Sequence, residues 1–320
     1  MPFWENQLDQ WLSEKPQRTA TSDFDAFWEE TQSLALSQSL NAQVVSVDYP
    51  SPKLSAYQVS FDAFGRGRLQ AWLLAPNLPT APPEKLPVLI LWHDYLGFRG
   101  RICTHLSWAL QGFVVLVPDI RGHGDSSDLT HYSWGNNKGY FPQGIQDVHE
   151  YYLRGCIADG LRAVQFLNDR DDVDTERIGV IGQGLGGVVS LWVAAFSPQL
   201  KALGAVSPYP CDWSRHIGTA SSTAASEVKT YLSRYPQQEE RVLKTLSYFD
   251  PINIAHRIRC QSLFVLGLKD STAPPQDSLG VYNRIEGEKG LKVFPYDGYG
   301  AGGDLGKEEL VRWMQDRLMP

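Results

Sequence analysis

Residues 178–196 read IGVIGQGLGGVVSLWVAAF, a short branched run that enters a glycine-rich turn and continues as a longer apolar run. Isoleucine and valine favour a strand, glycine permits a sharp turn, and the run after Gly187 has the length of a buried helix. A strand that passes directly into a helix is the repeating unit of parallel sheets. The segment therefore predicts an α/β fold in which the turn presents its central residue, Gly184, at the edge of a sheet.

The order strand, loop, helix recurs along the rest of the chain. Three early segments alternate or run apolar as half-buried strands do, and they predict an antiparallel entry to the sheet. The later strands are separated by helices, which predicts a mostly parallel, doubly wound sheet with helices on both faces. The predicted strands are 43–49, 57–63, 69–75, 88–92, 113–117, 178–181, 202–206, 263–266 and 291–294, and the predicted helices among them are 151–167, 187–196 and 277–285.

We expect one α/β domain over residues 1–320, because 42% of the residues are hydrophobic and such a chain buries a large core. Residues 1–40 read as two amphipathic helices that pack on this domain. Residues 212–247 form a polar, helical excursion, which is either a cap or an assembly surface.

The net charge of −7 argues against a nucleic-acid partner, because phosphates require a concentrated basic face. No run approaches the roughly 18 apolar residues of a membrane span. The N-terminus, MPFWENQLDQ, lacks the basic start and apolar stretch of a secretory signal, so we expect a cytoplasmic protein.

The turn fits the pattern G-x-S-x-G, in which a strained strand-to-helix turn exposes a nucleophilic serine. Gly182 and Gly186 are the flanking glycines, and the central position is Gly184, which has no side chain to attack a carbonyl. The same glycines superficially match a dinucleotide fingerprint. That fingerprint, however, usually lies on the first strand of a domain with an acidic residue about 20 positions later.

Other segments share one family pattern with this turn: LWHDYLGFRGR, DIRGHGDSS, YYLRGCIADGLRAVQFL, SPYPCDW, LSYFDPINIAHRI, GLKDSTAPP and NRIEGEKGLKVFPYDGYG. With them the whole chain resembles the acetyl xylan esterase and cephalosporin C deacetylase family. The resemblance implies an α/β-hydrolase fold, a Ser-His-Asp triad, deacetylation of small acetylated sugars, no metal or other cofactor, and assembly into a homo-oligomer, often a hexamer.

Carried over residue by residue, the resemblance keeps only part of the triad. Asp270 in GLKDSTAPP matches the triad acid. The serine falls on Gly184. The histidine falls on Tyr299 in PYDGYG, with Gly300 in place of the glutamate that follows it in the family. The Tyr299 hydroxyl is expected to donate a hydrogen bond to Asp270.

The oxyanion hole is altered as well. The resemblance assigns its two N–H groups to Tyr95 and Leu185, but Asp94 replaces the glycine that the family has in LWHDYLG. A carboxylate there would repel a developing oxyanion unless the side chain turned away. His93 resembles a structural residue beneath this loop, and the Arg121 guanidinium is expected to anchor a neighbouring loop by pairing with Asp159.

Four residues are predicted to line a pocket for a small ligand: Asp94, Phe98, Tyr209 and Trp213. The remaining histidines, such as His216, show no metal-ligand spacing and are expected at the surface or at helix ends.

Two functions follow from this sequence. The first is a non-hydrolytic descendant that binds a small ligand resembling an acetylated sugar, because serine and histidine are both missing. The second is an active carboxylic-ester hydrolase with a rearranged site, in which Tyr299 and Asp270 face His93 and Asp94.

Overall fold

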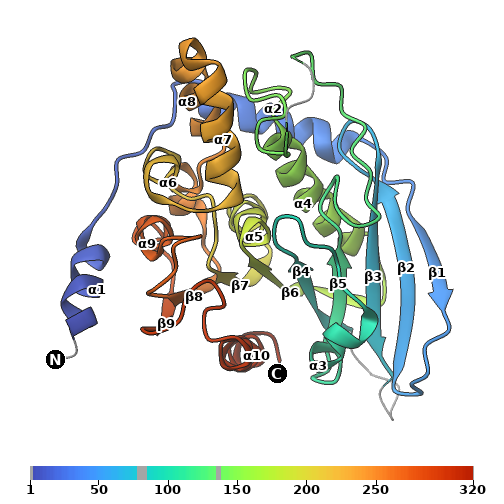
Figure 1. Cartoon of the computed structure of the whole chain (residues 1–320). Coiled ribbons are helices and arrows are strands. Elements are labelled where there is room, and N and C mark those ends of the chain that lie inside the picture. The colour runs from blue at the N-terminus through green and yellow to red at the C-terminus, as the bar shows by residue number, and fades with distance from the viewer. Residues whose placement is uncertain (1–2, 78–84, 135–137, 320) are drawn as a thin grey trace.

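The computed structural model describes residues 3–77, 85–134 and 138–319. Among these residues, nine strands form one sheet in the order β1-β2-β3-β5-β4-β6-β7-β8-β9 (Figure 1). The strands are β1 Gln43–Val47, β2 Leu54–Asp62, β3 Arg68–Pro76, β4 Leu86–Trp92, β5 Val114–Pro118, β6 Val173–Gln183, β7 Leu200–Val206, β8 Gln261–Gly267 and β9 Lys289–Phe294.

Strand directions divide the sheet into two parts. The pairs β1·β2, β2·β3 and β3·β5 are antiparallel, whereas every pair from β5 through β4 to β9 is parallel. The parallel strands β4, β5 and β7 are almost wholly buried, as expected where helices cover both faces. The predicted α/β class, with its antiparallel entry and doubly wound sheet, is confirmed.

Helices cover both faces of the sheet (Figure 1). The helices α2, α4 and α5 lie on one face, and α3 and α10 lie on the other. The helices are α1 Phe3–Ser13, α2 Phe24–Ser37, α3 Leu106–Ala109, α4 Tyr152–Asn168, α5 Leu185–Phe196, α6 Trp213–Thr219, α7 Thr223–Arg234, α8 Glu239–Ser247, α9 Pro275–Tyr282 and α10 Asp304–Leu318. None of the helices in the described part of the chain combines the length and the apolarity that crossing a membrane requires.

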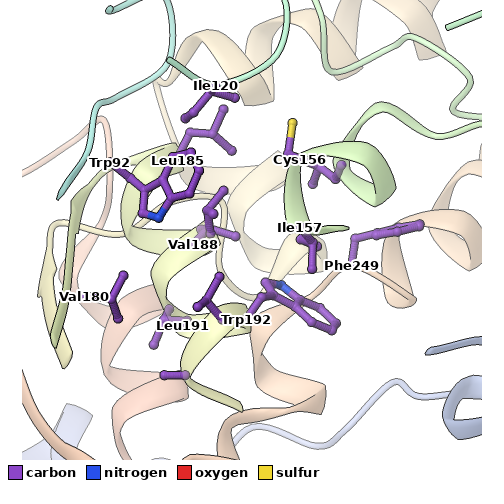
Figure 2. Close-up of a cluster of buried hydrophobic side chains, with 14 of the residues drawn as sticks. Trp92, Ile120, Cys156, Ile157, Val180, Leu185, Val188, Leu191, Trp192 and Phe249 are labelled. Atoms are coloured by element: carbon purple, nitrogen blue, oxygen red, sulfur yellow. The ribbon is translucent and has the colours of Figure 1, made fainter. Parts of the chain in front are cut away.

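Helix α5 is the centre of the larger core. Its residues Leu185 and Val188 lie beside Trp92 of β4, whereas Trp192 lies near Ile157 and Phe249 and packs on Trp28 of α2 with ring centroids 4.4 Å apart (Figure 2). The helix is apolar on all sides and is buried from Leu185 to Ala194, because the sheet covers one side while α2 and α4 cover others. The first residue of this helix, Leu185, is therefore held firmly at the carboxyl end of the inner strand β6.

The excursion after β7 is helical, as predicted, and comprises α6, α7 and α8. These helices lie beyond the ends of the parallel strands, on the side of the turn between β6 and α5 (Figure 1). Helix α7 is held by the cap at its start, where the Ser222 hydroxyl accepts a hydrogen bond from the backbone N–H of Ala225 at 3.0 Å. The excursion thus carries side chains toward the loops around Gly184.

Candidate functional site

Gly184 lies between the end of β6 and the start of α5, with φ 55° and ψ −121°. Its N–H donates to the carbonyl oxygen of Val206 at 3.0 Å, which ties the turn to β7. Two residues later the chains approach so closely that a Cβ on Gly186 would lie 2.5 Å from the carbonyl oxygens of Trp92 and His93. The sharp, glycine-dependent turn predicted from the sequence is therefore present.

The Asp94 carboxylate occupies the space above this turn. Its Oδ1 accepts the N–H of Tyr95 at 2.6 Å and the N–H of Leu185 at 3.0 Å. These are the two amides that the sequence resemblance assigned to an oxyanion hole, and the structure brings them to one oxygen atom. The Asp94 carboxylate would still repel the oxyanion of a substrate, as expected. It also occupies both N–H donors itself. Because a Cβ on Gly184 would overlap this carboxylate, Asp94 also fills the place of a serine side chain.

Tyr299 completes the arrangement. Its hydroxyl donates to Asp94 Oδ2, not to Asp270, so the predicted hydrogen bond between Tyr299 and Asp270 is wrong. The Asp94 carboxylate is the acceptor that the Tyr299 hydroxyl reaches, because Asp94 projects from the loop after β4 over Gly184. Burial raises the pKa of Asp94, and the hydrogen bonds from Tyr299 and the two amides oppose this rise. Burial and the Asp94 charge raise the pKa of Tyr299, so this phenol stays protonated and donates.

Asp270 follows β8, as the sequence indicated. Its Oδ1 accepts the N–H groups of Thr272 at 2.8 Å and Ala273 at 2.9 Å, which stabilises its own loop. Burial raises the pKa of Asp270, although these amides and the neighbouring Ser207 hydroxyl favour the ionised form. By geometric criteria Oδ2 has no hydrogen-bond partner among the described residues. The carboxylate thus lies where it could orient an imidazole, but within the described ranges its hydrogen bonds go to backbone amides and not to a histidine.

His93 supports the loop that carries Asp94. Its Nε2 accepts the N–H of Ile120 at 2.9 Å, so the ring proton is on Nδ1 and is donated to the carbonyl oxygen of Asp94 at 2.7 Å. Burial lowers the pKa of His93 to about 4, so the ring is neutral. The predicted structural role of His93 is confirmed.

The ion pair predicted on the neighbouring loop is present. The Arg121 guanidinium donates to both oxygens of Asp159, at 2.7 and 2.9 Å, and both side chains are buried. The bidentate contact fixes the loop that follows β5 to helix α4.

Glu227 of α7 is a site residue that the sequence analysis missed. Its two carboxylate oxygens each lie 2.9 Å from the Tyr95 hydroxyl, which in turn accepts the N–H of Tyr140 at 2.9 Å. Burial raises the pKa of Glu227, and the hydrogen bond from Tyr95 opposes this rise. The excursion therefore holds the loop that carries Asp94 and Tyr95 through a side chain that no sequence motif marks.

Of the residues predicted to line one ligand pocket, Phe98 lies apart, whereas Tyr209 interacts with Asp94 and packs, like Trp213, against His216. Phe98 is 56% exposed and lines a hollow beside Trp72 and Arg99. Tyr209 is buried with its ring 5.7 Å from that of Tyr299, and Trp213 is buried against Phe141. The fourth residue, Asp94, fills the turn. Arg99, the neighbour of Phe98, pairs with the buried Asp119.

A buried group of serine, histidine and aspartate side chains lies between α6, α7 and α9, away from the triad positions. His216 Nε2 is 2.7 Å from the Ser222 hydroxyl, and Nδ1 is 3.0 Å from Asp277 Oδ2. All three side chains are at most 1% exposed, so no substrate reaches the serine. His216 is not at the surface but lies in the last turn of α6, which is the other position expected for it. The hydroxyl already caps α7, which makes this group a structural one. In the part of the chain that the structure describes, no three His, Cys, Asp or Glu side chains gather as metal ligands do.

Comparisons with known proteins identify one family for this chain. The model of the acetyl xylan esterase family (AXE1) matches residues 1–317. Acetyl esterase Axe7A of Xylanibacter ruminicola is 23% identical over 314 residues, which cover 95% of this chain and 69% of that protein.

Solved structures agree. An acetyl xylan esterase from Paenibacillus sp. R4 superimposes with a TM-score of 0.93 at 33% identity, covering 99% of this chain and 100% of that one. Acetyl xylan esterase 1 from Thermoanaerobacterium sp. JW/SL YS485 superimposes with a TM-score of 0.87 at 25% identity, covering 98% of each chain.

Proposed function

Since the chain belongs to the acetyl xylan esterase family, with an α/β-hydrolase fold, we propose that it is a member that no longer hydrolyses esters and instead acts by binding. One observation carries this proposal. The Asp94 carboxylate accepts both amide N–H groups at the place where the family's serine and the substrate oxyanion would meet.

Acyl transfer at this turn requires an attacking oxygen, a base and two free N–H donors. Gly184 supplies no oxygen, and Tyr299 is a protonated phenol that already donates to Asp94. Removing a working triad costs about a million-fold in turnover, which corresponds to about 8–9 kcal/mol. The rate enhancement that remains without a triad comes largely from the oxyanion donors, each of which contributes about 10²–10³-fold to kcat. Because Asp94 occupies both donors, most of this remaining enhancement is lost as well.

The alternative is hydrolysis by a rearranged site. The side chains nearest to Gly184 are those of Asp94 and Tyr299. The carboxylate would have to abandon three hydrogen bonds before it could attack a carbonyl or take a proton from water. The geometry therefore favours the binding function, and the ligand of such a protein would bind outside the filled turn.

Turnover of p-nitrophenyl acetate tests the proposal. We expect the purified wild-type protein and an Asp270→Ala variant to release p-nitrophenol at the same rate, equal to that of the heat-denatured wild-type protein. A fluorophosphonate probe should leave the intact mass unchanged, because this chain has no activated serine at the turn. Wild-type turnover that falls at least about tenfold in Asp270→Ala would overturn the proposal, because the triad acid would then be working.

A further inference from the structure

The largest of the cavities that we describe has a volume of about 580 Å³ and lies away from the turn at Gly184. Its walls come from the start of α4, the loop after β2 and the segment 130–132. Neither Asp94 nor Asp270 lines it. We propose that this cavity binds a small organic anion that carries a phosphate or carboxylate group on a ring.

Three arginines give the cavity its charge: Arg66, Arg121 and Arg154. Arg121 is neutralised by Asp159. By contrast, neither Arg66, which is exposed, nor Arg154 has a carboxylate within 4.0 Å among the described residues. Arg66 and Arg154 therefore bring two positive charges to the wall, against the one negative charge of Glu150, although the chain as a whole carries −7.

Arg154 carries the argument furthest, because it is 8% exposed and incompletely paired. Nε donates to the Thr31 hydroxyl at 3.0 Å and Nη1 to the carbonyl oxygen of His149 at 3.0 Å. Nη2 is buried and has no acceptor among the described residues. Burying an unpaired charged donor is costly, and an anion is the partner that would offset this cost.

One carboxylate competes on the wall itself. Glu150 lines the cavity, but its two oxygens are held by the backbone N–H and the hydroxyl of Ser133. Glu30 and Asp147 act on Arg154 only from a greater distance, and burial lowers the pKa of Arg154 despite them. Glu150 keeps its negative charge, because the groups that hold its oxygens are neutral, so Arg66 and Arg154 exceed it by one positive charge on this wall.

The aromatic side chains on the cavity walls are the reason to expect a ring in the ligand. They are Phe64, Tyr132, Tyr151 and Tyr152. The Tyr151 hydroxyl is buried without a hydrogen-bond partner among the described residues. The ring faces on these walls offer contact to an apolar ring. The volume is within the range of small-molecule sites.

Isothermal titration of the full chain with phenyl phosphate tests the proposal, with phenol as the uncharged probe and inorganic phosphate as the ringless one. We expect phenyl phosphate to bind more tightly than either. In Arg66→Ser, which changes an exposed side chain and preserves the fold, the Kd should rise by about 3- to 10-fold. Arg154→Met should bind at least about 10-fold more weakly. Arg312→Ser, on the exposed surface of α10, should bind as the wild type does.

Three results would overturn the inference. They are the absence of binding at millimolar phenyl phosphate in about 100-fold excess over the protein, equal affinity of Arg66→Ser and Arg312→Ser, and equal affinity for phenol and phenyl phosphate. None of them bears on hydrolysis at Gly184, so this proposal fails or stands independently of the proposed function.

Discussion

A methyl group added at residue 184 tests whether the Asp94 carboxylate fills the space above the turn. A Cβ on Gly184 would overlap Asp94 Oδ1 and the Tyr299 hydroxyl, and the positive φ strains any other L-residue. Overpacking costs about 1–3 kcal/mol and a strained backbone costs about 1–3 kcal/mol. Gly184→Ala should therefore lower the free energy of unfolding by about 2–6 kcal/mol.

Asp94→Gly removes the obstructing carboxylate and so separates the cost of overpacking from the cost of backbone strain. In that background the overlap with the carboxylate is gone, and the alanine at residue 184 should retain the strain of about 1–3 kcal/mol and its contact with the Tyr299 hydroxyl. The double variant is then more stable than the sum of the single variants by about 1–3 kcal/mol, which is the coupling expected for residues in contact.

Urea denaturation of the wild type, both single variants and the double variant gives this coupling directly. A control cycle pairs Gly184→Ala with Asp172→Ala, because Asp172 is 57% exposed and pairs with Arg170, away from the turn. We expect the control to be additive. Additivity within about 0.5 kcal/mol for Asp94 as well would refute the conclusion that its carboxylate fills this space.

Three further predictions concern the surroundings of the turn. Burial lowers the pKa of His93 from its ordinary value of 6.5 to about 4 in the folded protein. The contribution of His93 to the free energy of unfolding is therefore full above pH 6.5 and is lost as the pH falls toward 4. Urea denaturation should show a loss of about 2 kcal/mol between about pH 7.5 and 5, and His93→Gln should lack this loss. Glu227→Ala should lower the free energy of unfolding by about 1–2 kcal/mol, and Tyr95→Phe should add little to it in a double-variant cycle. Trp192→Ala, in the centre of the core, should cost about 3–5 kcal/mol, measured by calorimetry.

Much of the fold was predictable because it depends on local patterns. The branched run before Gly184 and the apolar run after it defined β6 and α5, and alternation of strands and helices defined the parallel sheet. The pairing of Arg121 with Asp159 followed from the family pattern. Helix α10 was not assigned residue bounds from the sequence, since its apolar residues are interrupted by charged ones.

The contacts at the site were less predictable because they join loops that are far apart in the chain. The Tyr299 hydroxyl and the Asp94 carboxylate are 205 residues apart, and the Tyr95 hydroxyl and Glu227 are 132 residues apart. A sequence names the residue types at such positions but does not say which of two carboxylates, Asp94 or Asp270, a phenol reaches. The buried group at His216 was missed for the same reason, because its acid lies 61 residues away.

The most direct test of the central claim is the turnover of p-nitrophenyl acetate by the wild type and two revertants. One revertant carries Gly184→Ser and Tyr299→His, and the other carries Asp94→Gly in addition. We predict background rates for the wild type and the double revertant, and a rate at least about 10³-fold higher for the triple revertant. A wild-type rate equal to that of the triple revertant, or a double revertant as active as the triple one, would contradict the account.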